Sequence, residues 1–206
     1  MAYPTIDAPY GFRPVNLLGG QVYSGSTRKI PIASGHATNI FYGDLVSLSA
    51  SGCINKLTTT DALVAAIGVF MGCSYINSLG QRLYSQYYPA TVSQAVDDVN
   101  ETQAFVADDP DLLMKVAIVA GAASLVISAA NRIAMVGGGA IISQGAGSTI
   151  TGNSSQAILS ATAVTTTLPL KVVDVVREPM NASASFTEVI VTWNGGVHQY
   201  RTITPV

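Results

Sequence analysis

Two histidines, His36 and His198, are the side chains of this 206-residue sequence best suited to acid–base chemistry near neutral pH. Nucleophilic hydrolysis would need a serine or cysteine activated by one of them, but neither histidine lies in a known catalytic motif. The nucleophile motif Gly-x-Ser-x-Gly does not occur, and the glycine run 137–139 lacks the lysine of a phosphate-binding loop. We therefore expect surface or loop positions for both histidines and no enzymatic activity.

Carboxylates form two short clusters whose oxygens are of the kind that hard cations bind. Asp97 and Asp98 form the first cluster, and Asp108, Asp109 and Asp111 form the second. The alternating Asp-x-Asp-x-Asp-Gly pattern of a calcium loop is missing. An Asp-Asp-Pro-Asp turn that caps its own backbone explains the second cluster without a metal. We expect neither a metal nor another cofactor.

Cys53 and Cys73 are the only cysteines, and each follows a glycine in an apolar context. They lack the second pair that a metal site would need. Two free, buried thiols are the favoured interpretation, although a disulfide between neighbouring strands stays open. Free thiols fit a protein made in a reducing cytoplasm.

The composition is poor in charge and rich in apolar residues. Charged residues make up 11% of the chain and hydrophobic residues 49%, with a net charge of −2, whereas soluble chains average about 25% charged. Part of the surface is therefore expected to be covered by other subunits. No apolar run reaches the roughly 18 residues of a membrane span, and no basic block indicates nucleic-acid binding. We expect neither partner.

Short runs rich in β-branched and aromatic residues recur between turn-forming segments, which predicts an all-β fold with a single barrel or sandwich domain. The turns are predicted at SASG (49–52), NSLG (77–80) and DDPD (108–111). The segment 124–136 fits one short helix as well as it fits strands. It belongs to a Gly-, Ser- and Ala-rich excursion at about 121–167, which we expect to be loops with brief strands.

The first 28 residues are expected to form an extended arm outside the β domain of residues 29–206. Prolines at 4, 9 and 14 push the residues before them into extended geometry, and the segment lacks the continuous apolar run of a signal peptide. Tyr10, Phe12, Arg13 and Pro14 are the predicted partner-binding residues, because aromatic residues and arginine dominate interface energetics. Deletion of residues 1–20 is expected to leave a folded protein that has lost its partner.

Tyrosines cluster in RLYSQYY, with Tyr84, Tyr87 and Tyr88 near one another. They could stack on a sugar ring or fill a protein interface, or they could alternate between the core and the surface of one strand. Aromatic enrichment together with charge depletion favours an interface over sugar binding.

The run IPIASGHATNIFYGDLVSLSASGCINKL, followed by AAIGVFMGCSYI, resembles segments of the capsid cement, or decoration, proteins of tailed bacteriophages. The leader PYGFRPVNLLGG is similar to the start of small structural proteins encoded near the capsid gene of such phages. The likeness covers the first half of the chain and, loosely, LKVVDVVREPMNASASFTEVIVTWN. It implies that Gly43 and Asp44 form a turn and strand start, and that Gly68 and Val69 form the strand that pairs with it.

The resemblance implies a bacteriophage structural protein on the capsid surface of the virion, made in the host cytoplasm. Such a protein binds the assembled major capsid protein, staples neighbouring capsomers and self-associates, often as a homotrimer. A head-tail or tail structural subunit would share the composition. A carbohydrate-binding module that uses the tyrosine-rich strand is an alternative from another class.

Overall fold

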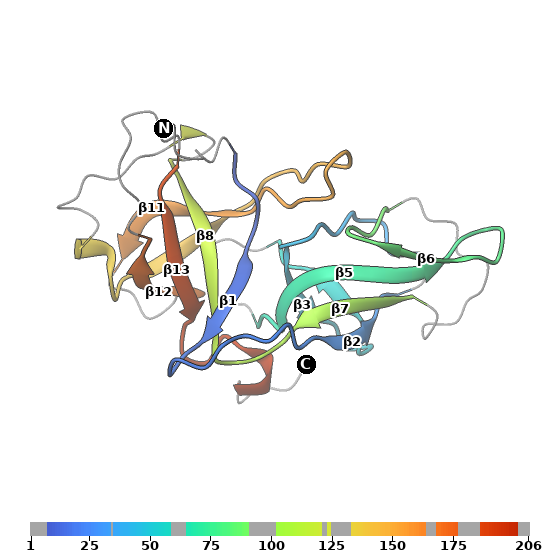
Figure 1. The fold of residues 1–206 in the computed structure, drawn as a ribbon, viewed down its shortest axis with the longest axis horizontal. Helices are drawn as coiled ribbons and strands as arrows, with labels where there is room; N and C mark the ends of the chain where they lie inside the picture. Colours follow the sequence, from blue (N-terminus) through green and yellow to red (C-terminus); the bar gives the residue numbers. More distant parts are fainter. Residues whose placement is uncertain are drawn as a thin grey trace.

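The computed structural model describes residues 8–33, 35–58, 65–90, 102–120, 123–124, 133–163, 168–176 and 186–201. Strands make up 48% of the structure and helical residues 4%. The predicted all-β fold is therefore confirmed. The molecule has two lobes, each built on one β-sheet (Figure 1).

Besides a helical turn at residues 133–135, thirteen strands and one short 3-10 helix are described, in the order that follows. They are β1 (Arg13–Leu17), β2 (Arg28–Pro31), β3 (Leu45–Leu48), β4 (Ile54–Lys56), β5 (Gly68–Ile76), β6 (Arg82–Ser85), β7 (Gln103–Ala107), β8 (Leu112–Ala120), β9 (Ala123–Ser124), β10 (Gly139–Ser143), β11 (Ala157–Ala163), β12 (Leu170–Val175), β13 (Glu188–Trp193) and η1 (Gln199–Arg201).

The first lobe is a closed barrel of five strands. Its strands are hydrogen-bonded in the order β8, β11, β10, β12 and β13, and β13 pairs with β8 again. The β8–β11 pairing is parallel and the other four are antiparallel. Along β8, Met114 and Val116 are buried while Lys115 between them is partly exposed, as the two-residue period of a strand requires. β1 and β9 also pair with β8.

The second lobe is a smaller sheet in the order β2, β7, β5, β3 and β4, with β6 added to the far end of β5. A parallel bridge between Ile32 and Ile54 joins the two ends of this order. β5 and β6 form a hairpin that extends away from the barrel (Figure 1). Leu45 pairs with Val69 and Val46 with Gly68, which confirms the strand pairing implied by the resemblance.

The two lobes share part of one hydrophobic core. The larger buried cluster contains barrel residues such as Met114 and Val191 together with Leu45, Val69 and Ala107 of the second sheet. A second buried cluster lies within the smaller sheet, around Phe70 and Tyr88. Because side chains of both sheets pack in one cluster, the lobes support each other.

The middle segment contributes more regular structure than its composition suggests. β10 and β11, two of the five barrel strands, come from the Gly- and Ser-rich stretch expected to form an excursion. The loop 144–156 between them lies beside the second lobe. Residues 133–135 are helical, and most of the predicted helix at 124–136 falls outside the described residues.

Candidate functional site

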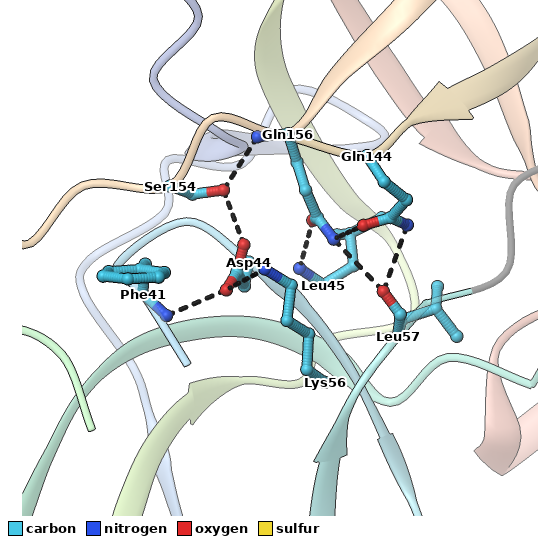
Figure 2. A network of polar contacts seen from close by, with 8 residues as sticks. All are labelled: Phe41, Asp44, Leu45, Lys56, Leu57, Gln144, Ser154 and Gln156. Carbon is cyan, nitrogen blue, oxygen red and sulfur yellow. Dashed lines mark hydrogen bonds and ion pairs between the residues drawn. The ribbon is translucent and has the colours of Figure 1, made fainter. Parts of the chain in front are cut away.

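Asp44 is the centre of a buried polar network at the junction between the lobes (Figure 2). Its side chain has no exposed surface, and its Oδ2 lies 3.1 Å from Nζ of Lys56. The backbone N–H of Phe41 donates to the same Oδ2 at 2.8 Å, and the hydroxyl of Ser154 donates to Oδ1 at 2.6 Å. The carboxylate therefore closes its own turn and also binds the loop 144–156 of the barrel.

Two glutamines extend this network along β3 (Figure 2). The backbone N–H of Leu45 donates to Oε1 of Gln156 at 2.8 Å, and Nε2 of Gln156 donates to the Leu57 carbonyl at 3.2 Å. Nε2 of Gln144 donates to the same carbonyl at 3.1 Å. Side chains of the barrel loop thus satisfy backbone groups of the second lobe, which would otherwise be buried without partners.

Hydrogen bonding accounts for the buried carboxylate without a chemical role. A carboxylate removed from water is stable only when it is paired and hydrogen-bonded, and Asp44 has three partners. The nearest cation, Lys56, has a side chain only 12% exposed. We therefore assign to the Asp44 network the role of joining the lobes.

The leader crosses this junction at a point where its backbone touches the turn before β3. The Phe12 N–H donates to the Gly43 carbonyl at 2.8 Å. Gly11 has a φ of +81°, and a Cβ there would lie 2.7 Å from the Gly43 oxygen. A side chain at position 11 would thus be strained in its backbone and would also clash with Gly43.

The predicted partner-binding residues make contacts within this chain. Phe12 is fully buried in the larger core cluster, and Pro14 pairs with Met114 in the barrel sheet. The Tyr10 hydroxyl donates to Glu188, which also binds Lys115 at 3.0 Å. The expected free arm is therefore, from residue 8 onward, partly a strand and partly core. Binding of these residues to another protein stays a prediction.

Arg13 joins the leader to the loop 144–156. Its guanidinium lies 4.0 Å from the centre of the Tyr42 ring, and Nη2 donates to Oδ1 of Asn153 at 2.8 Å. The same Asn153 oxygen accepts a hydrogen bond from Nε2 of Gln86 at 2.9 Å. Burial lowers the pKa of Arg13 from its ordinary value.

The two histidines, for which no catalytic role is expected, lie in different parts of the fold. His36 packs near Tyr88, whereas His198 packs between Trp193 and Tyr200. Burial lowers the pKa of both histidines. Among the described residues no group of three or more His, Cys, Asp or Glu side chains could hold a metal ion; Asp97 and Asp98 lie outside these residues.

Both cysteines are free and buried, as favoured from the sequence. Burial raises the pKa of the Cys73 thiol to about 12, so it is protonated at neutral pH. In the DDPD turn, Oδ1 of Asp109 accepts a hydrogen bond from the Asp111 N–H at 2.8 Å, which confirms that the turn caps its own backbone.

Exposed apolar side chains lie mainly on projecting turns and hairpins. Their exposed fractions range from 38% for Val15 and Leu83 to 96% for Ile150. They are Val15, Leu18, Val22, Leu79, Leu83, Tyr84, Ile133, Val136, Ile150 and Tyr200. The β5–β6 hairpin carries three of them, and Tyr84 stacks on Phe105. From the sequence, NSLG in this hairpin is predicted only as a turn, and the Leu at its tip is the signal that could have indicated an exposed apolar group.

The tyrosines divide between core and surface, which was one of the alternatives left open, although only Tyr84 lies in β6. Tyr88 is 1% exposed and belongs to the core, while Tyr84 is 74% exposed. Tyr87 stacks on Phe41 with 5.4 Å between ring centres. A sugar platform built on Tyr87 and Tyr88 is therefore not available at the surface, because Tyr88 is covered.

The fold places the protein in the all-β class, with a closed five-stranded barrel. No helix in the described part of the chain has the length and hydropathy of a membrane span. Comparison of the chain with protein-family models, with curated proteins and with solved structures finds no match.

Proposed function

We propose that this chain is a virion structural protein that binds the outside of an assembled major capsid protein lattice and staples neighbouring capsomers. The proposal begins from the resemblance of segments 30–57 and 65–76 to phage cement proteins. It also agrees with the low content of charged residues, 11% of the chain, because charge depletion is typical of surface that is buried at protein interfaces.

The observation that carries the proposal is the β5–β6 hairpin, which exposes apolar and aromatic side chains. It projects from a protein whose two lobes are joined by the buried Asp44 network. Leu79 is 79% exposed and Tyr84 74% exposed, although neither is needed for the core. An exposed apolar group of this kind on a charge-poor protein is typical of a contact surface. A rigid junction matters for a staple because less conformational freedom is lost on binding.

Self-association, as a homotrimer, is part of the proposal. Repetition of weak contacts raises the avidity of each copy for the lattice without any new contact. The leader is not the free arm expected from the sequence, since Phe12 belongs to the core. We now expect deletion of residues 1–20 to lower stability as well as any occupancy on capsids.

The test is the number of copies in particles assembled by co-expression with the major capsid gene. A cement protein should be present in amounts comparable to the major capsid protein, measured by gel densitometry. The double variant Leu79→Ser with Tyr84→Ser should keep its melting temperature and lose most of its occupancy. Lys171→Ser, an exposed change on β12, is the matched control. A few copies per particle, or full occupancy of the double variant, would contradict this role for the chain or for the hairpin respectively.

A further inference from the structure

A pocket of about 300 Å³ lies where the segment after β1, the DDPD turn and η1 meet. Leu17, Val22 and Pro110 supply apolar lining, and Tyr23 and Tyr200 supply aromatic lining. The volume is at the lower end of the range for small-molecule sites, roughly 300–1,000 Å³. The pocket is built from three segments that are far apart in the sequence.

An ion pair organises the polar side of this pocket. Nε of Arg28 lies 2.9 Å from Oδ2 of Asp108, and the Tyr200 hydroxyl donates to the same oxygen at 3.0 Å. The Arg28 guanidinium also lies 4.9 Å from the centre of the Tyr200 ring. Burial, followed by the hydrogen bond to Asp108, raises the pKa of Tyr200 to about 12, which keeps this phenol protonated. Three side chains are thus held in one arrangement before any ligand arrives.

Several polar groups of the pocket have no protein partner within the described part of the chain. Arg28 uses only Nε in its ion pair, so both of its Nη groups can donate. Oδ1 of Asp108 can accept, because both contacts of this carboxylate involve Oδ2. The exposed hydroxyls of Ser24 and Ser26, which also line the pocket, can donate and accept. Donors and acceptors therefore lie side by side next to aromatic rings.

This combination selects a class of ligand. One arginine and two carboxylates, Asp108 and Asp109, give the lining a formal charge of −1, which disfavours anions, while the fixed Arg28 disfavours cations. A neutral polyol can donate hydroxyls to a carboxylate, accept from a guanidinium and place its C–H groups against an aromatic ring. We propose that this pocket binds a neutral saccharide.

The proposal does not depend on the capsid role. None of the pocket residues belongs to the β5–β6 hairpin or to the Asp44 network. It also differs from a platform at Tyr87 and Tyr88, because Tyr88 is buried in the core.

The test is ligand-observed NMR on the full chain with the methyl glycosides of glucose, galactose, mannose and N-acetylglucosamine, followed by titration of those that bind. Ser24→Trp should occlude the pocket, since Ser24 is an exposed lining residue. Thr27→Trp places the same bulk on a nearby exposed residue outside the lining and serves as the control. We expect at least one glycoside to bind, with an affinity about ten-fold or more lower in Ser24→Trp and unchanged in Thr27→Trp.

A second variant tests the hydrogen-bonding groups of the pocket rather than its free volume. Asp108→Asn keeps an oxygen for Arg28 and Tyr200 but loses the charged acceptor, so glycoside affinity should fall about ten-fold or more. Melting temperatures of all variants establish that they are folded. Absence of binding by all four glycosides, binding that Ser24→Trp and Asp108→Asn leave unchanged, or preferential binding of inorganic phosphate would each overturn the proposal.

Discussion

The leader, residues 8–17, and the β5–β6 hairpin both combine a tyrosine, an arginine and a glycine with apolar residues. In the leader, Phe12 is fully buried and Tyr10 and Arg13 bind side chains of other segments. In the hairpin, Leu79 and Tyr84 are more than 70% exposed. The leader has a facing surface on β8 and on the turn before β3, whereas the outer part of the hairpin extends away from the barrel (Figure 1).

Residue type alone therefore does not identify a partner-binding segment. Similar side chains stabilise the fold where the chain supplies a complementary surface, and they stay available where it does not. The leader was the predicted binding segment because its aromatic residues and arginine are interface types. Substitutions in each region separate a segment that stabilises the fold from one that is free to bind.

Phe12→Ala should produce the largest effect. Removing a fully buried aromatic side chain from the larger core cluster should lower the free energy of unfolding by about 3–5 kcal/mol. Denaturant titration measures the change, with Leu83→Ala on the partly exposed hairpin strand as the control. A loss below about 1 kcal/mol would mean that the leader does not belong to the core.

Asp44→Ala should disrupt the polar network that holds the turn before β3, which the leader contacts. The change leaves the Lys56 ammonium in a poorly exposed position without its partner, and it also removes acceptors of Phe41 and Ser154. We expect unfolding free energy to fall by about 3 kcal/mol. Asp174→Ala, at an exposed position of β12, should change it by less than about 0.5 kcal/mol. Equal effects of the two changes on denaturation would contradict the role given to the network.

Arg13→Ala should have an intermediate effect. It removes a cation–π contact with Tyr42 and a hydrogen bond to Asn153, together worth about 1–2 kcal/mol. Lys29→Ala is the control, because Lys29 is exposed and lies 6.0 Å from the Phe105 ring centre. Denaturation that fails to distinguish the two variants would show that Arg13 is dispensable for the fold.

Acid should weaken the fold through the histidines. Burial lowers the pKa of His36 and His198 in the folded protein, so the unfolded chain binds more protons just below its histidine pKa of about 6.5. Stability from these groups is fully present above that pKa and is lost as the pH falls toward the folded values. Unfolding free energy should therefore decrease from about pH 7 to pH 5.

A double variant tests the source of that pH dependence. His36→Gln with His198→Gln should flatten the slope of unfolding free energy against pH, whatever its effect on stability at neutral pH. A slope that is unchanged in the double variant would assign the acid sensitivity to other groups.

Tyr84→Ala should have the smallest effect on stability. The side chain is 74% exposed and loses only its stacking on Phe105, so unfolding free energy should change by about 0.5 kcal/mol or less. Thermal unfolding of the variant checks this. A large destabilisation would show that the hairpin, like the leader, stabilises the fold and is not free to bind.

Local patterns were enough to predict the class of fold and several turns. Residues 68–76 and 112–120 carry the apolar and β-branched content of strands, and both form strands of nine residues. The turn at 77–80 is closed by a hydrogen bond from Gly80 to Asn77, and the DDPD turn caps itself. These features depend on residues that are close in the sequence, where propensity and side-chain chemistry act directly.

The candidate site could be predicted only in part. Gly43 and Asp44 were expected at a strand start, but the partners of Asp44 were not, because Ser154 lies 110 positions away. An interface was favoured for RLYSQYY, which contains β6, but the projecting hairpin with Leu79 at its tip was not predicted, because the same residues would also fit a buried strand pair covered by another segment. The sequence marked the types of residue that bind, and it did not indicate which of them would be covered.

An all-β protein with few charges and turns at defined places could be derived from the sequence alone, since each of these follows from composition or short-range chemistry. The free state of both cysteines was only favoured, because a disulfide depends on which strands become neighbours. Tertiary structure decided the rest. Closure of the barrel requires β13 to return to β8, and the link from Gln156 to Leu45 joins residues 111 positions apart. Such contacts depend on which surfaces meet after the strands have paired, and local sequence patterns do not predict that geometry.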